Sequence, residues 1–215
     1  MVLRHWVILA VIGFALGASQ YVTGTAYADL ATDAAALPDR VMGNADAPVT
    51  IIEYASLTCN HCAQFHSDSF DKLKTNYIDA GKVRFIFRDF PIDGVALRVA
   101  AVARCMPESS YHPFISLLFK NQAAWIKPEV EDKVKAAAQY AKLGGLNDVD
   151  AKACAANEKL LDAIVAAKTH ATEKYKIEST PSFVFNDGVE ILSGARPYDD
   201  FVKVIERLIA EAKKK

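Results

Sequence analysis

The spacing of apolar and polar residues predicts two buried strands joined by a helix in the first half of the chain. Residues 49–55 (VTIIEYA) and 83–87 (VRFIF) are rich in β-branched and aromatic side chains, as buried strands are. Between them, residues 59–80 place apolar side chains three or four positions apart, which indicates a helix, and Gly81 is suited to end it. A strand, a helix and a strand within about 40 residues predict a βαβ unit with parallel strands.

A helical block follows, and a hairpin and a final helix close the chain. Apolar periodicity predicts four helical segments, near 95–105, 112–126, 128–143 and 148–175. Asn157 is a candidate break within the last segment. Two strand-like runs, 182–185 and 189–192, flank residues 186–188 (NDG), a sequence typical of a hairpin turn. Residues 199–213 have one apolar face and predict an amphipathic helix.

The predicted elements run β-α-β, then helices, then β-β-α. Without the helical block about 100 residues remain, which is the size of one small α/β domain. We therefore predict an α/β fold with a helical insertion of about 80 residues. The domain consists of residues 29–93 and 177–215, and the insertion is 94–176. Residues 29–48 are small and polar and are expected to lead into the first strand without an element of their own.

Residues 1–28 have the features of an export signal. Arg4 precedes an apolar run over residues 6–16, which is shorter than the roughly 20 residues that cross a bilayer. Residues 26–28 (AYA) then suit a cleavage site before Asp29. We predict a cleaved signal peptide, with an uncleaved membrane anchor as the alternative. Export to an oxidising compartment favours disulfides between cysteines.

Composition narrows the possible functions. Hydrophobic residues make up 52% and charged residues 24% of the 215 positions, which is globular composition. Lys and Arg total 25 against 26 Asp and Glu, so no excess positive charge favours nucleic acid as a partner. The four cysteines are too few for a disulfide-rich mini-protein, and their uneven spacing separates one close pair from two distant residues.

The close pair is Cys59 and Cys62, with Asn60 and His61 between them, at the start of the first predicted helix. A CxxC motif that follows a strand of a βαβ unit is typical of a redox-active dithiol. Unpaired N–H groups and the helix dipole favour a thiolate at Cys59, lowering its pKa below the roughly 8.5 of a free thiol, and His61 could add a cation or an N–H donor. Cys62 is expected to be more buried and to resolve mixed disulfides. A stabilised thiolate makes the disulfide form more oxidising.

Two further positions are candidates for this site. Glu53 interrupts the first strand six residues before Cys59. Pointing beneath the helix, it could take and return the proton of Cys62 during exchange, whereas at a strand edge it would only be solvated. Thr180 and Pro181 open the third strand, where Pro has no N–H to give to the sheet. In a loop beside the dithiol, the backbone of Thr180 could pair with an extended substrate.

The stretch RVMGNADAPVTIIEYASLTCNHC, the helical insertion, and STPSFVFNDG followed by a terminal helix together resemble a known family. They are similar to the DsbA-like thiol oxidases of the thioredoxin superfamily, alphaproteobacterial members in particular, over residues 37–215. The resemblance implies a thioredoxin-like fold in which Cys59 attacks and Cys62 resolves. It also implies that Glu53 is a buried acid, and that Pro181 is a cis Pro facing the motif.

The resemblance further implies partners and a location. Members pass a disulfide to reduced, unfolded exported proteins in the periplasm and are reoxidised by a DsbB-like quinone-linked membrane oxidase. No cofactor of the protein's own is expected. Members often carry Pro between the cysteines, whereas this chain has Asn60. For this chain the resemblance therefore implies the reaction class more firmly than it implies the redox potential.

The other two cysteines, Cys105 and Cys154, fall 49 residues apart in the predicted insertion. In an exported protein we expect a structural disulfide between them. Closing a loop of that length is worth about 4 kcal/mol in the loop-entropy model. The resemblance suggests such a second bridge too. Two buried thiols, or a second redox pair that modulates the first, are the alternatives.

Other functions compete with this hypothesis. Zinc would need ligands beyond one CxxC motif, so no metal is expected; His66 and His170 are expected on helix surfaces and His112 at a helix start. A non-catalytic thioredoxin-like binding module would keep its function without Cys59. A reductase or isomerase is the alternative among enzymes, but isomerases of this superfamily usually carry a separate dimerisation domain. Too few residues precede the first strand for such a domain, and we expect a monomer.

Overall fold

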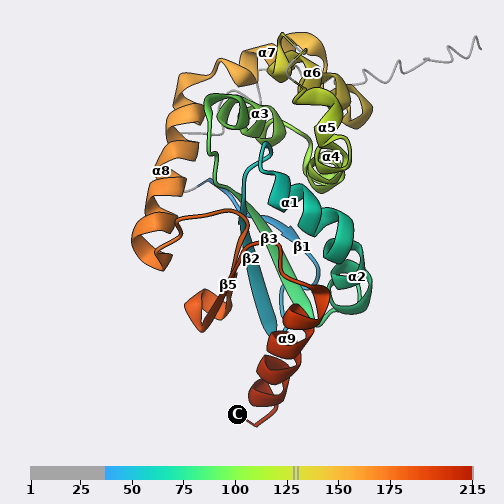
Figure 1. Cartoon of the computed structure of the whole chain (residues 1–215), viewed down its shortest axis with the longest axis vertical. Helices are drawn as coiled ribbons and strands as arrows, with labels where there is room; N and C mark the ends of the chain where they lie inside the picture. The colour runs from blue at the N-terminus through green and yellow to red at the C-terminus, as the bar shows by residue number, and fades with distance from the viewer. Residues whose placement is uncertain (1–36, 128, 130, 215) are drawn as a thin grey trace, which may run out of the picture.

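A mixed five-stranded sheet lies at the centre of the described part of the chain (Figure 1). The computed structural model describes residues 37–214 except 128 and 130, so the predicted signal peptide lies outside the described residues. The strand order is β1-β3-β2-β4-β5, with β2 parallel to β3 and the other pairs antiparallel. The strands are β1 (Arg40–Met42), β2 (Val49–Ala55), β3 (Val83–Asp89), β4 (Ser182–Phe185) and β5 (Glu190–Ser193). The predicted βαβ unit and hairpin are confirmed.

One long helical stretch joins β2 to β3 and packs on the same face of the sheet as the C-terminal helix α9 (Tyr198–Ala212). It contains α1 (Asn60–Phe65) and α2 (Asp71–Leu73), each followed by a wider π turn, at His66–Phe70 and Lys74–Ile78. The apolar side chains that face the sheet are buried: Cys62, Phe65, Phe70, Leu73 and Tyr77. Gly81, with φ +70°, follows the end of this stretch, as predicted.

Six α-helices lie between β3 and β4 in the described residues. They are α3 (Gly94–Arg104), α4 (Glu108–Lys120), α5 (Gln122–Trp125), α6 (Lys133–Ala141), α7 (Asp148–Ala155) and α8 (Glu158–Tyr175). Asn157 caps α8, so the predicted break at this residue is confirmed. In Figure 1, α3–α7 gather at one end of the molecule, while α8 runs back along its side.

Alternate residues of the central strands face two different layers. Ile51, Glu53 and Ala55 lie on the side of α1 and α9. Ile52 and Tyr54 point the other way and are buried with side chains of α8 and the segment after it. None of the helices in the described residues combines the length and apolar character that crossing a membrane requires.

Two expectations for the fold are wrong. Residues 29–48 were expected to hold no element, but Arg40–Met42 form β1, an edge strand whose pairing partners, such as Ile86 for Val41, are distant in sequence. Helix α4 begins at Glu108 rather than at His112. Pro113 suggested a helix start at His112, yet it is the sixth residue of the helix, where its lack of an N–H removes one backbone hydrogen bond of the second turn.

Candidate functional site

The sulfur of Cys59 caps α1. Cys59 precedes the first residue of the helix in an extended conformation, and its Sγ accepts a hydrogen bond from the Cys62 N–H at 3.3 Å. Both cysteines are free thiols, and Cys62 is fully buried whereas Cys59 is 7% exposed. Asn60 and His61, between them, are exposed. The predicted order of burial, with the second cysteine deeper, is confirmed.

The two thiols differ strongly in acidity. A hydrogen bond with the Cys62 thiol, helped by the backbone N–H groups of Cys62 and His61, lowers the pKa of Cys59 from 9.0 to about 6, although burial opposes this. Burial, the hydrogen bond to Cys59 and the charge of Glu53 all raise the pKa of Cys62 well above its ordinary range. At neutral pH the electrostatics therefore favour one thiolate at Cys59 and one protonated thiol at Cys62.

Residues distant in sequence meet beside Cys59. The Cys59 thiol donates to the Thr180 carbonyl oxygen at 3.3 Å, and the Thr180–Pro181 peptide bond is cis. Pro181 is buried, and its carbonyl accepts a hydrogen bond from the Gly194 N–H at 2.8 Å. The predicted loop thus lies next to the first cysteine of the motif, with the Thr180 carbonyl in contact with its sulfur.

Glu53 lies beneath the helix, in the middle of the sheet. It is fully buried on β2, in register between Phe87 on β3 and Phe183 on β4. The charge of this carboxyl group is one of the causes that raise the pKa of Cys62. The reading of Glu53 as a solvated edge residue is therefore wrong.

His66 was expected on a helix surface, and this is wrong. Its side chain is 3% exposed, and its Nε2 lies 3.0 Å from Glu53 Oε2. His66 follows Cys62 by four positions, which places both on the same face of a helix. That spacing was a signal for burial that the sequence reasoning missed.

The insertion reaches the dithiol through Gln122, which the sequence did not indicate. This buried side chain donates from Nε2 to the carbonyl oxygens of Leu57 at 2.8 Å and of Cys59 at 3.0 Å. The loop between β2 and α1 is also held by its own residue Thr58, whose hydroxyl donates to Asp93 Oδ2 at 2.7 Å. The insertion therefore fixes the backbone from which the Cys59 side chain projects.

Cys105 and Cys154 form a disulfide in the insertion. Cys105 follows α3 and Cys154 lies in α7, with their Cα atoms 6.4 Å apart. Both residues are buried. The expected pairing is present in the structure. The bridge joins two helices that pack against each other and encloses the segment that carries Gln122.

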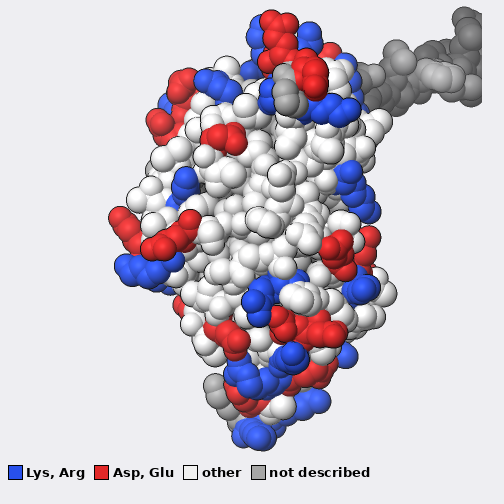
Figure 2. All heavy atoms as spheres, viewed as in Figure 1, with Lys and Arg blue, Asp and Glu red and all other residues white. Residues whose placement is uncertain are grey.

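The surface above the dithiol carries few charges. In Figure 1 the start of α1 lies in the upper middle of the view, and Figure 2 shows mostly uncharged atoms over the middle of this face. Charged side chains gather around its margins and over α9. An unfolded chain with apolar side chains could lie on such a surface with little charge to desolvate.

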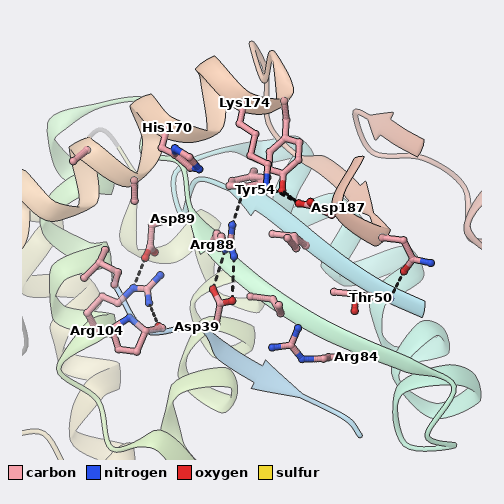
Figure 3. A pocket seen from close by; sticks show the side chains of 18 residues that line it. Asp39, Thr50, Tyr54, Arg84, Arg88, Asp89, Arg104, His170, Lys174 and Asp187 are labelled. Atoms are coloured by element: carbon pink, nitrogen blue, oxygen red, sulfur yellow. Dashed lines mark hydrogen bonds and ion pairs between the residues drawn. The ribbon is translucent and has the colours of Figure 1, made fainter. Parts of the chain in front are cut away.

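A separate hollow of about 890 Å³ lies between α8 and the other face of the sheet (Figure 3). Three acidic side chains lining it are each paired with a basic one: Asp39 with Arg88, Asp89 with Arg104, and Asp187 with Lys174. No cysteine lines this hollow. It is therefore distinct from the dithiol site. In the described part of the chain, no three His, Cys, Asp or Glu side chains are grouped to hold a metal ion.

Comparison with known proteins gives relatives over most of the chain. A family model described as thioredoxin matches residues 35–207. A putative protein-disulfide oxidoreductase of Rickettsia bellii is 31% identical over 179 residues, covering 82% of this chain and 67% of that protein. One of Rickettsia felis is 29% identical, covering 82% of this chain and 62% of that protein. The chain thus spans about two thirds of the length of these relatives.

Solved structures agree with the family match. The crystal structure of alpha-DsbA1 from Wolbachia pipientis is 33% identical, with a TM-score of 0.74 over 81% of this chain and 92% of that chain. Oxidised BdbD from Bacillus subtilis, 23% identical with a TM-score of 0.68 over 80% of this chain and 93% of that one, shares the fold. The chain belongs to the thioredoxin family, and within it to the DsbA-like thiol-disulfide oxidoreductases.

Proposed function

We propose that the protein is a disulfide donor: its oxidised Cys59–Cys62 pair passes a disulfide to reduced, unfolded proteins that have been exported. The observation that carries this proposal is the lowered pKa of Cys59, about 6. Stabilising the thiolate of the reduced form increases the free energy released on reduction, which makes the disulfide a stronger oxidant. A reductase or isomerase would instead need its dithiol to stay reduced.

The reaction proceeds in two exchanges. A substrate thiolate attacks Cys59 Sγ, the Cys59–Cys62 bond breaks, and its electron pair goes to Cys62 Sγ, which takes a proton. A second substrate thiolate then attacks the substrate sulfur of the mixed disulfide and releases Cys59 as a thiolate. Glu53, buried beneath α1 and near enough for its charge to raise the pKa of Cys62, is the group we assign to donate the proton in this direction and accept it in the reverse direction. The substrate gains one disulfide and the protein becomes a dithiol.

Thr180 and Pro181 are the proposed contact for the substrate chain. The Thr180 carbonyl already lies 3.3 Å from Cys59 Sγ. An extended segment that pairs with the backbone here would bring its own cysteine sulfur to Cys59 Sγ. The uncharged face around the start of α1 would accept apolar side chains on either side of that cysteine.

The proposed setting is the periplasm, reached through the signal predicted at residues 1–28. There a DsbB-like quinone-linked membrane oxidase would return the dithiol to the disulfide, and the protein would act as a monomer. The chemistry requires an oxidant, because each turnover leaves Cys59 and Cys62 reduced, and a membrane oxidase of this class is the one that the family resemblance implies.

The first test is the equilibrium reduction potential of Cys59–Cys62 against glutathione, with Cys105–Cys154 intact. A value close to that of strongly oxidising DsbA, about −120 mV, supports a disulfide donor. A value close to that of thioredoxin, about −270 mV, overturns the proposal in favour of a reductase or isomerase. The second test is oxidation of a reduced, unfolded model protein. Cys59→Ser should abolish it; activity that survives this substitution would point to a binding module.

A further inference from the structure

Two buried polar atoms at the centre of the site have no hydrogen-bond partner among the described residues: Glu53 Oε1 and His66 Nδ1. The other oxygen of the carboxyl group, Oε2, lies 3.0 Å from His66 Nε2. Glu53 is fully buried and His66 is 3% exposed. Because unpaired buried polar atoms are costly, this half-satisfied pair calls for a functional explanation.

The ring of His66 is held in one orientation by its neighbours. It stacks on Phe119 of α4, with centroids 4.3 Å apart and planes 24° apart. Phe70 packs at 4.6 Å, and Phe65 meets the ring edge-on at 5.3 Å. His66 also begins a π turn, a local widening of a helix that is frequent at functional sites. These contacts keep Nε2 directed at the Glu53 carboxyl group.

The hydrogen bond to the carboxylate sets the roles of both groups. With Glu53 ionised, Nε2 carries the proton and donates it to Oε2, and Nδ1 is a bare acceptor. A proton that arrives at Glu53 then binds Oε1, while the Nε2–H···Oε2 bond is kept without any movement. A proton on Oε1 leaves both groups neutral, whereas a proton on Nδ1 would leave a buried imidazolium beside a buried carboxylate, and burying charged groups is costly. Burial therefore favours Glu53 as the site of the proton and His66 as its support.

We propose that His66 is a positioning residue, which holds the Glu53 carboxyl group through Oε2 so that Oε1 exchanges a proton with Cys62. When the Cys59–Cys62 bond breaks, the proton moves from Oε1 to the Cys62 sulfur and leaves a carboxylate. When the bond forms again, the proton returns to Oε1. This inference rests on the proposed role of Glu53 but not on the direction of disulfide transfer.

Two substitutions separate the hydrogen bond from the ring. His66→Phe keeps a ring for the stack on Phe119 but removes the donor, whereas His66→Gln loses the ring and keeps an N–H that can reach Oε2. The measurement is the rate at which dithiothreitol reduces the Cys59–Cys62 disulfide, followed by alkylation and mass spectrometry. We expect His66→Phe to slow this step at least tenfold and His66→Gln to stay within about threefold of the unaltered protein.

The same substitutions in a Glu53→Gln background complete the test. Glu53→Gln should slow the reaction, and His66→Phe should then change it by less than twofold, because His66 acts through Glu53. His170→Phe, at an exposed position on α8, is the matched control and should leave the rate unchanged. The positioning role alone would be overturned if His66→Phe and His66→Gln slowed the reaction equally. It would also be overturned if His66→Phe slowed the reaction in the Glu53→Gln background as much as it does in the unaltered protein. No effect of Glu53→Gln would overturn the role of Glu53 and this inference with it, while the assignment as a disulfide donor still depends on the potential.

Discussion

Of the two cysteine pairs, one is a pair of free thiols and the other is a disulfide. Cys59 and Cys62 are three residues apart, unbonded, and placed where a helix begins, so their thiols have very different acidities. Cys105 and Cys154 are 49 residues apart and bonded, between two packed helices. A bond across three residues constrains the unfolded chain little, so its local electrostatics decide its chemistry. A bond across 49 residues constrains it strongly, and this pair can serve stability.

The comparison is tested most strongly by removing the long-range pair. Cys105→Ala with Cys154→Ala should lower the free energy of unfolding by about 4 kcal/mol, because the unfolded chain regains loop entropy. Urea denaturation of the oxidised proteins measures this difference. Oxidation of a reduced substrate should persist below the new unfolding midpoint. A loss of exchange by the folded variant would instead make this pair a second redox centre, the alternative that the sequence left open.

The short-range pair is tested by pH. Alkylation of Cys59 by iodoacetamide should titrate with a midpoint near the pKa of about 6. The pKa lies below its ordinary 9.0, so the stabilisation of the reduced protein by the thiolate is complete above about pH 9 and is lost as pH falls through about 6. Cys62→Ala should move the midpoint upward, because the largest cause of the lowering is the hydrogen bond with the Cys62 thiol.

The matched control for this titration is the double variant at Cys105 and Cys154, which should leave the midpoint of Cys59 where it is. A midpoint that stays near 6 in Cys62→Ala would contradict the assignment of the acidity to the neighbouring thiol. The lowered pKa of Cys59 would then be caused by the backbone N–H groups at the start of α1.

The smallest expected effect comes from the contact between the two regions. Gln122→Leu leaves the carbonyl oxygens of Leu57 and Cys59 without their buried donor and should cost about 1–3 kcal/mol of stability. It should also slow exchange, since the loop before Cys59 loses its support. Gln139→Leu, an exposed glutamine on α6, should change stability by less than about 0.5 kcal/mol. Equal effects of the two substitutions would mean that the insertion does not support the site.

The sequence predicted those features that depend on local patterns. Apolar periodicity located β2, β3, β4 and the helix after β2, and the CxxC motif located the start of that helix. The resemblance to a known family predicted that the Thr180–Pro181 loop lies beside Cys59. Thr180 and Cys59 are 121 residues apart, so no local pattern could predict their contact. Edge strand β1 was missed because three residues show no periodicity, and its stability comes from pairing with β3.

Two residues of the site were missed for a different reason. His66 was expected in solvent because an ionisable residue usually prefers water, although its spacing from Cys62 places it on the buried face. Its partner, Glu53, lies 13 residues earlier on a strand, so only the packing of helix on sheet joins them. Gln122 gave no signal at all, since its contacts are carbonyl groups of a loop more than 60 residues away.

The sulfur of Cys59 caps α1, and it is also the atom at which we propose that exchange takes place. A side-chain cap is worth about 0.5–2 kcal/mol to a helix, and this one accepts best as a thiolate. When the sulfur is bonded to a substrate it loses its negative charge, and the Cys62 amide keeps only a weak acceptor. The charge on the atom that caps the first turn of α1 therefore changes whenever the Cys59 sulfur forms or breaks a disulfide. The amide resonance of Cys62 should report, without any added label, whether the Cys59 sulfur is a free thiolate or is bonded to another sulfur.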